Sequence, residues 1–477
     1  MINALTLILM TLWLGVLVVG IGQLARRRWV WGAVLAIEGA LAVAAQAALS
    51  LIPVGIGNPL IRITQRDFLT CSVLALVVTL LLAVPVFGRK RRQTASVSKT
   101  DAVYKTDAVY KTDAVFGRLN LIAALLTPVL AAGSLYGLSV LSTPVRERER
   151  DPLKRNLQLE PGFSAEIYLQ ATPENGLDNP TTMTFGPDGK LYVADIAGNL
   201  WVGVDKDNDH KIDQLSKFAE GYSLLLGLAW RGDELYVSSA GKVEAIKDTN
   251  GDGKADARRT LAEGLPSMIL APHSNNSLTF GPDGRLYFGV GNTTISGPEK
   301  HPLGGTIVSV SPDGGDARVF ASGFDNPFEA AFNSKGDMFS GDSSSRTTPD
   351  GETAPDGFTQ VKEGGDYSAL SSGVNSGDKQ LPLIGLAPHS TPTGLTFYTG
   401  KTYPAEYFDN AFSALWQKGD VLRIQLVQDA QGRYQAIDSV FGSGFLYPID
   451  VINGPDGNLY IADFGTSVVY RITYEGK

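Results

Sequence analysis

The chain has 477 residues, more than one ordinary domain holds, and its charge is distributed unevenly. The first 150 residues carry 16 Lys and Arg against 7 Asp and Glu, whereas the rest carry 25 against 42. This pattern suits a basic membrane segment joined to an acidic, water-facing domain, and it argues against nucleic-acid binding, which needs a basic face. The single cysteine, Cys71, excludes an internal disulfide and a haem attached through Cys-x-x-Cys-His.

Residues 1–145 are predicted to form four transmembrane helices, because they contain four apolar runs that are each about 20 residues or longer. The runs are Ala4–Gln23, Trp29–Leu51, Phe68–Phe87 and Leu119–Leu141. A cleaved signal peptide is the alternative for the first run, but no basic segment precedes it and three more runs follow. No histidine occurs before His210, so these helices cannot hold a haem between paired histidines. An anchor in the lipid bilayer is the simpler expectation.

Basic residues predict the orientation of these helices. Arg26–Arg28 follow the first run and Arg89–Arg92 follow the third, which places both loops in the cytoplasm by the positive-inside rule. The loop after the third run, residues 88–118, repeats one short segment three times and is expected to be a low-complexity, solvated linker, with a docking peptide as the alternative. The sequence therefore predicts a multi-pass protein of the cell (inner) membrane whose C-terminal part is periplasmic or extracellular.

Residues 146–156 are interpreted as a linker and residues 157–477 as a six-bladed β-propeller. A strand, a turn rich in Gly, Pro and Asp, and a second strand recur six times, in residues 184–195, 228–237, 279–290, 331–339, 394–416 and 451–463. A period of roughly 45 to 60 residues of short strands is typical of propeller blades. Phe163–Leu169 is expected to supply the outer strand that closes the ring with the last blade. The predicted fold class is an all-β propeller ectodomain preceded by an α-helical four-span transmembrane region.

His273 is the candidate catalytic residue. It lies just before the inner strand of the third repeat, a position that faces the central channel of a propeller. A histidine with a pKa near neutral can take a proton from a sugar hydroxyl. The alternative is a histidine bonded into a contact between blades. His389 occupies the corresponding position before the fifth inner strand, whereas His210 and His301 lie in loops without such a position.

Two acidic loops are candidate calcium sites because oxygen ligands recur at alternate positions. The candidate ligands are Asp205, Asp207, Asp209 and Asp213 in the first loop, and Asp248, Asn250, Asp252 and Asp256 in the second. Neither loop is an EF-hand, since the twelfth positions are Ser216 and Arg259 rather than Glu. The second loop is the favoured calcium site, because Gly253 permits a sharp turn there. The first loop has His210 at the corresponding position. An Asp/Asn/Gly turn without an ion is the alternative for both loops.

Several phrases of the chain resemble the quinoprotein glucose and sorbosone dehydrogenases. They are His273 followed by residues 278–287, the segment 323–332, and residues 389–395. The resemblance covers about residue 157 to the C-terminus. It implies a six-bladed propeller enzyme that oxidises a sugar or aldose at pyrroloquinoline quinone (PQQ), which is held on Ca²⁺ over the channel.

The resemblance also implies roles for individual residues. His273 would be the general base that drives hydride transfer to the quinone. The implied cofactor contacts are Asn326, His389 and Tyr447. Either Gln417 or Lys418 would be a further contact, because both match the same position of the family pattern. Backbone oxygens in the stretch that includes Ser344 and Ser345 would hold the active-site Ca²⁺. A membrane quinone or another acceptor would take the electrons.

The sequence departs from the family pattern where cations are expected. Asp325 stands where the family has arginine, and no arginine lies in 445–450, before the last blade. PQQ carries three carboxylates, so the loss of cationic partners weakens its site. We therefore expect a membrane-anchored PQQ-dependent sugar dehydrogenase, with a non-catalytic binding or sensor propeller that has lost the quinone as the alternative. A lactonase-type hydrolase would need carboxylates along the channel, and Asp325 is the one that the sequence places there.

Overall fold

The computed structural model describes residues 155–476 except 268–272, 295–297, 345–351 and 369–378. The chain divides into two units, 1–148 and 149–477, and all the described residues belong to the second. The four predicted transmembrane runs and the 88–118 loop lie outside the described residues. Within the described ranges, no helix is long and apolar enough to cross a membrane.

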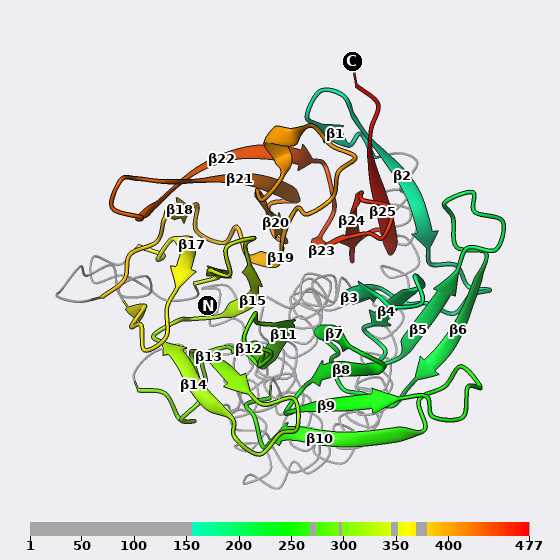
Figure 1. Ribbon diagram of the computed structural model, residues 1–477, viewed down its shortest axis with the longest axis horizontal. Coiled ribbons are helices and arrows are strands. Elements are labelled where there is room, and N and C mark those ends of the chain that lie inside the picture. Colours follow the sequence, from blue (N-terminus) through cyan, green and yellow to red (C-terminus); the bar gives the residue numbers. More distant parts are fainter. Residues whose placement is uncertain (1–154, 268–272, 295–297, 345–351, 369–378, 477) are drawn as a thin grey trace, which may run out of the picture. The chain divides into compact units, whose positions relative to one another are not determined.

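The described residues form six antiparallel sheets arranged in a ring, which confirms the predicted six-bladed propeller (Figure 1). Blade one consists of β3 (Pro180–Phe185), β4 (Leu191–Asp195), β5 (Leu200–Val204) and β6 (Gln214–Ala219). Blade two consists of β7 (Gly227–Arg231), β8 (Glu234–Ser239), β9 (Lys242–Lys247) and β10 (Ala257–Glu263). Blade three consists of β11 (Asn275–Phe280), β12 (Leu286–Val290), β13 (Thr306–Val310) and β14 (Arg318–Ser322).

In the second half of the ring, blades five and six each include a strand from the N-terminal end of the propeller. Blade four consists of β15 (Pro327–Phe332), β16 (Met338–Asp342), β17 (Asp356–Val361) and β18 (Ile384–Leu386). Blade five consists of β19 (Pro392–Phe397), β20 (Ala411–Leu415), β21 (Asp420–Gln428), β22 (Tyr434–Ser443) and the short β1 (Gln158–Leu159); a 3₁₀ turn, Ala405–Tyr407, lies between β19 and β20. Blade six consists of β23 (Pro448–Asn453), β24 (Leu459–Asp463), β25 (Val468–Tyr474) and β2 (Phe163–Gln170).

The turn that joins the first two strands of a blade is fixed by its sequence. In blade three, Gly284 has φ of +79°, a conformation that glycine adopts without strain. The Asp283 carboxylate accepts the Arg285 N–H at 3.1 Å and the Tyr287 hydroxyl at 2.9 Å. The same Gly-Pro-Asp-Gly sequence makes the corresponding turns in blades one and six. This repeated local chemistry is why the repeats could be recognised in the sequence.

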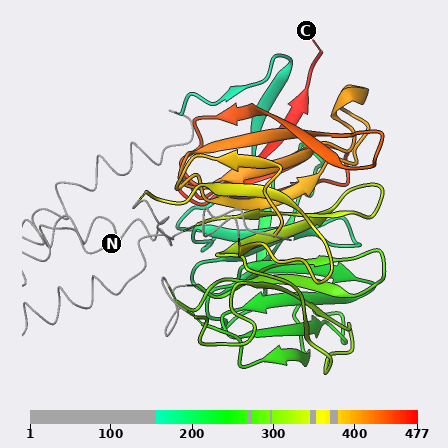
Figure 2. The same cartoon turned by 90° about the vertical axis from the view of Figure 1, so that its left-hand side faces the viewer.

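The ring is closed by β2, as predicted for Phe163–Leu169. It pairs with β25 from Phe163 opposite Tyr474 to Gln170 opposite Val468. In the side view of Figure 2, β2 (cyan) and β25 (red) again lie side by side. The sequence did not predict β1, which pairs with β22 on the neighbouring blade. Residues 155–170, which we call the strap, therefore hold the edges of blades five and six.

The six inner strands β3, β7, β11, β15, β19 and β23 contact one another in order around the axis of the ring. We call the side on which these strands begin the entrance rim. Aspartates at the ends of second strands hold the loops of this rim. Asp342 accepts the backbone N–H groups of Asp325 and Asn326, and Asp463 accepts those of Leu446 and Tyr447. These contacts fix the loops that carry the candidate site.

Candidate functional site

His273 lies on the entrance rim, two residues before the start of β11, and is half-buried. Its Nδ1 is 2.6 Å from Oδ1 of Asn292, which follows β12. The Asn292 amide nitrogen donates to Oδ1 of Asp325, the residue predicted to have replaced an arginine. The Ser344 hydroxyl donates to the other Asp325 oxygen at 3.1 Å. The structure therefore brings His273 and Ser344 into one hydrogen-bonded network through two residues that sequence reasoning did not connect.

A close approach of two blades makes this network possible. A Cβ added at Gly291 would collide with Cβ of His273 from the same blade and with Oδ1 of Asn326 from blade four, so only glycine fits there. The Asn292 N–H also donates to the Asp325 carbonyl oxygen at 2.6 Å. Blades three and four are thus joined at the rim by backbone and side-chain hydrogen bonds.

Asn326, a predicted cofactor contact, lies beside the network. Its N–H donates to Asp342 at 2.7 Å, and its side-chain oxygen accepts from Asn276 at 2.9 Å. Asn326 is partly exposed, whereas Asn276 and Asp342 are buried. The asparagine is therefore held in place on the rim next to His273.

Buried carboxylates gather on the rim of blade four. Burial raises the pKa of Asp342 to about 7, and the nearby Asp325 adds to this rise. Burial also raises the pKa of Asp356 to about 6, although the Ser344 and Thr391 N–H groups that it accepts oppose the rise. The sequence placed only one of these acids at the channel. The three carboxylates favour a bound cation over a bound anion.

Two more carboxylates lie deeper, on inner strands. Glu329 accepts the Ser277 hydroxyl at 3.0 Å and the Leu395 N–H at 2.7 Å, and so links β15 to both neighbouring inner strands. Asp450 accepts the Thr182 hydroxyl at 3.1 Å and the Met183 N–H at 2.8 Å across the junction of blades six and one. Sequence reasoning missed both acids, although each is the third residue of an inner strand.

The other predicted cofactor contacts lie on blades five and six. His389 is exposed and has φ of +62°. The Gln417 N–H donates to Ser390, the neighbour of His389, at 3.3 Å. The Tyr447 ring stacks on Trp416, with ring centroids 5.1 Å apart. These residues therefore share one sector of the rim.

Two predicted site residues are less favourably placed or not described. Lys418 is exposed and forms an ion pair with Asp420 at 3.2 Å. Ser345 lies outside the described residues. A lysine paired in this way is a weaker candidate for a cofactor contact than its sequence position suggested.

Both predicted calcium loops join the third and fourth strands of their blades, so they lie outside the channel site. In the first loop, the side-chain oxygens of Asp205, Asp207 and Asp209 lie within 4.8 Å of one another. His210 adopts φ of +66°, the conformation that glycine has at position 253 in the second loop. The histidine therefore does not prevent the first loop from turning.

The two loops also fold alike in detail. Asp205 accepts the N–H groups of residues 208 and 210, and Asp248 accepts those of residues 251 and 253. Asp213 and Asp256 accept the N–H of the second residue of their loops, at 2.7 and 2.9 Å. Within the second loop, Asn250 Oδ1 accepts the Asp252 N–H at 2.8 Å. Calcium binding by either loop remains a prediction.

The architecture and the rim define the class of the protein as a six-bladed β-propeller with a polar, histidine-containing rim. A family model described as a domain of unknown function, DUF7133, matches residues 151–472. The chain therefore belongs to this family.

Similar proteins support the fold assignment. An uncharacterised protein of Borreliella burgdorferi is 21% identical over 367 residues, which cover 68% of this chain and 93% of the relative. A Thermus thermophilus structure described as an oxidoreductase (glucose dehydrogenase) is 24% identical, with a TM-score of 0.53, and covers 65% of this chain and 100% of its own.

Two PQQ-related structures have the same propeller. The PQQ-bound aldose sugar dehydrogenase of Streptomyces coelicolor is 19% identical, with a TM-score of 0.52, over 66% of this chain and 99% of its own. The PQQ domain of Coprinopsis cinerea pyranose dehydrogenase is 15% identical, with a TM-score of 0.54, over 67% of this chain and 97% of its own. At these identities the likeness establishes a shared fold.

Proposed function

We propose that the propeller is an oxidoreductase of the sugar (aldose) dehydrogenase kind in which His273 removes the hydroxyl proton. The observation that carries this proposal is the hydrogen bond between His273 Nδ1 and Asn292 on the entrance rim. A general base must be held in orientation and also be reachable by its substrate. The Asn292 contact holds the His273 ring in orientation, and the side chain is partly exposed on the rim, so both requirements are met.

In this reaction the sugar O–H bond breaks and its proton moves to the imidazole. The neighbouring C–H bond breaks as a hydride leaves, and the carbon becomes a carbonyl. PQQ, the cofactor named for two structures with this fold, would supply the hydride acceptor. The remaining contribution of the protein is to orient His273, to hold Asn326 at the rim and to stabilise the imidazolium that forms.

The described rim residues fit PQQ incompletely. PQQ carries three carboxylates, which Arg or Lys would neutralise best. Asp325 is instead acidic and 0% exposed, and Lys418 already pairs with Asp420. The carboxylates of Asp325, Asp342 and Asp356 would neutralise the charge of a Ca²⁺ ion beside Ser344, so the rim suits the cation better than the quinone.

The proposal includes the location of the protein. Residues 1–145 would anchor the chain in the cell (inner) membrane with the propeller on the periplasmic or extracellular side, and a membrane quinone would accept the electrons. The four apolar runs and the basic loops motivate this arrangement. Carbonate extraction of membranes tests the anchor, and protease treatment of intact spheroplasts tests the side on which the propeller lies. Release of the chain by carbonate would contradict the proposal.

A second candidate function is a non-catalytic binding or sensor propeller that has lost the quinone. The buried Asp325 favours it, because this carboxylate is bonded to Asn292 and Ser344 rather than offered to an anion. This candidate predicts no turnover for the wild type or for a variant at His273.

The experiment that separates the two uses the purified full chain with micromolar PQQ and millimolar Ca²⁺. PQQ binding is followed by absorbance, and dye reduction is measured with a panel of aldoses. We expect His273→Gln to lower turnover by roughly 10²–10⁴-fold. The control is His301→Gln, which replaces a histidine that caps the Leu303 N–H in a loop. Absence of saturable PQQ binding would reject the dehydrogenase in favour of the second candidate.

A further inference from the structure

The chemistry of a carboxylate decides how the Asn292 side chain is oriented. An ionised carboxylate only accepts hydrogen bonds, whereas an amide has one accepting end and one donating end. Asn292 reaches Asp325 with its nitrogen, and the Ser344 hydroxyl donates to the other oxygen of the same carboxylate. The amide end that faces Asp325 must therefore be the NH₂ group. The opposite assignment would set two acceptors against each other in a buried place.

This orientation leaves the Asn292 oxygen for His273. The oxygen lies 2.6 Å from His273 Nδ1, and an amide oxygen can only accept. Nδ1 must then carry a hydrogen. In a neutral imidazole only one ring nitrogen is protonated, so the lone pair is on Nε2.

The linking residues have little freedom to rearrange. Asn292 and Asp325 are both 0% exposed, so water does not compete for their hydrogen bonds. The Asp325 N–H is bonded to Asp342, and the Asn292 N–H is bonded to the Asp325 carbonyl oxygen. Backbone hydrogen bonds of both residues therefore restrict the two side chains that link His273 to Ser344.

We propose that Asn292 and Asp325 are positioning residues that fix His273 in the tautomer protonated at Nδ1. The Nε2 lone pair is then the proton acceptor, and Asp325 offsets the positive charge of the imidazolium through the Asn292 amide. The catalytic consequence rests on the proposed dehydrogenase function, whereas the tautomer itself does not. The inference also assigns a role to Asp325: its carboxylate acts on the His273 base through Asn292 rather than on the quinone.

Nitrogen NMR of the full chain labelled with ¹⁵N-histidine tests the tautomer directly, because protonated and unprotonated ring nitrogens differ widely in chemical shift. The chain has four histidines, so His273→Gln assigns the relevant signals. At a pH where the imidazole is neutral, we expect the Nδ1–H form of His273. A wild-type His273 that is mainly protonated at Nε2 would overturn the proposal.

Three variants test the two positioning residues. Asn292→Leu and Asp325→Leu should each abolish the preference for the Nδ1–H form, because the first removes the acceptor and the second releases the amide. Asn292→Asp should retain it, because the adjoining carboxyls of residues 292 and 325 would share one proton and the oxygen facing Nδ1 would still accept. Either leucine variant that folds and keeps the wild-type tautomer would overturn the role of the residue replaced.

A matched control and a kinetic measurement complete the test. Asn276→Leu removes another buried rim amide, one that bonds Asn326 and Pro327 instead of His273, and should leave the tautomer unchanged. If the enzyme turns over, Asn292→Leu should lower kcat by roughly 10²–10⁴-fold with little change in KM, because a wrong tautomer removes the base and not the binding site. A wild type with the Nδ1–H tautomer and no turnover would reject the dehydrogenase alone.

Discussion

The inner strands carry two carboxylates, Glu329 and Asp450, whose pKa values are both raised. Burial raises the pKa of Asp450 to about 6, against the hydrogen bonds from Thr182 and Met183. Burial and the nearby Asp450 raise the pKa of Glu329 well above its usual range. Among the described residues, no basic side chain contributes to either shift. These acids join neighbouring blades, but ionisation of either carboxylate lowers the free energy of unfolding of the protein.

Asp450→Asn should change how stability depends on pH. The folded protein holds the Asp450 proton more tightly than the unfolded chain does, so the free energy of unfolding falls as pH rises from about 4 to about 6 and then stays level. Asparagine keeps an accepting oxygen and cannot ionise. We therefore expect the variant to match the wild type near pH 4 and to exceed it at pH 8 by up to about 3 kcal/mol.

Urea denaturation at several pH values measures this effect. Asp438→Asn, on the exposed face of β22, is the control, because it removes an acidic charge that is in water in both states. A variant at Asp450 that is no more stable than the wild type at pH 8 would show that the carboxylate is compensated in the folded protein.

The position of His273 could be predicted from the sequence, but its partners could not. The blade repeat places residue 273 just before an inner strand, and the structure places it on the rim. Asn292 and Asp325 follow it by 19 and 33 residues. Their meeting depends on the register of two neighbouring blades and on the close approach at Gly291, which no local pattern reports.

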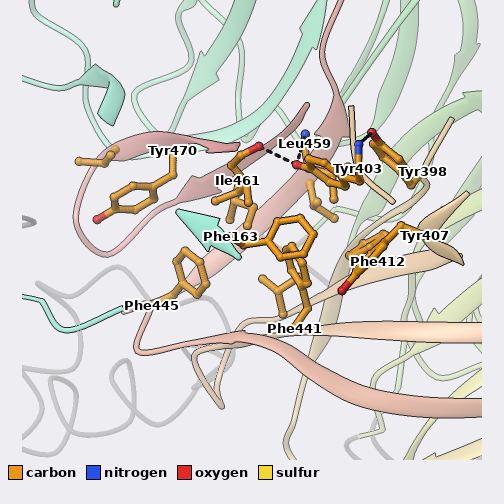
Figure 3. Close-up of a cluster of buried hydrophobic side chains, with 14 residues drawn as sticks. Phe163, Tyr398, Tyr403, Tyr407, Phe412, Phe441, Phe445, Leu459, Ile461 and Tyr470 are labelled. Carbon is orange, nitrogen blue, oxygen red and sulfur yellow. Dashed lines mark hydrogen bonds between the residues drawn. The ribbon is translucent and has the colours of Figure 1, made fainter. Parts of the chain in front are cut away.

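At the scale of elements, the strap joins blades five and six through one aromatic residue and one acid. Phe163 packs edge-on against Tyr403, Tyr407 and Phe441, with ring centroids 4.8, 5.0 and 4.9 Å away (Figure 3). Glu160 accepts the Tyr407 hydroxyl at 2.6 Å and pairs with Arg423 at 3.3 Å. The strap therefore belongs to the core of the ring closure.

Phe163→Ala should destabilise the propeller by about 3–5 kcal/mol, because it empties the centre of this aromatic cluster. Phe408→Ala is the matched control, since Phe408 is 49% exposed and its loss should change stability by no more than about 0.5 kcal/mol. The difference in urea midpoint between the two variants measures the effect. Equal midpoints would mean that the strap is not needed for closure.

The acidic loops predict a calcium-dependent stability. If the loop at 248–256 binds Ca²⁺ in the folded state alone, Ca²⁺ at about 100 times its Kd should stabilise the protein by about 2.7 kcal/mol. A double substitution of Asp248 and Asp252 by Asn should remove most of this gain. Thermal unfolding in Ca²⁺, in Mg²⁺ and in EDTA measures it, and a wild type indifferent to Ca²⁺ would contradict the prediction.

The two loops also show why sequence spacing was only a partial guide. His210 made the first loop the less favoured calcium candidate, because glycine is the usual residue at that position. The structure gives His210 and Gly253 the same left-handed conformation. Hydrogen bonds from both loops to Asp205 and Asp248 hold this conformation regardless of the residue.

At the scale of the whole molecule, the fold was predictable because each blade repeats its own turn chemistry. Glycines and aspartates in the turns revealed six copies, and β2 closed the ring as expected. The attachment of β1 to blade five was not predictable, since its two residues have no strand pattern of their own. The fold provides a ring of inner strands with a histidine at its rim, and the chemistry depends on the side chains placed there.

The most direct test of the whole account is a single-turnover reaction. The full chain loaded with PQQ and Ca²⁺ is mixed with an excess of an aldose, and the absorbance of the protein-bound quinone is followed in time. The account predicts that the wild type reduces the quinone and that His273→Gln does so at least about 100-fold more slowly. Equal rates for the two proteins would contradict the assignment of His273 as the base.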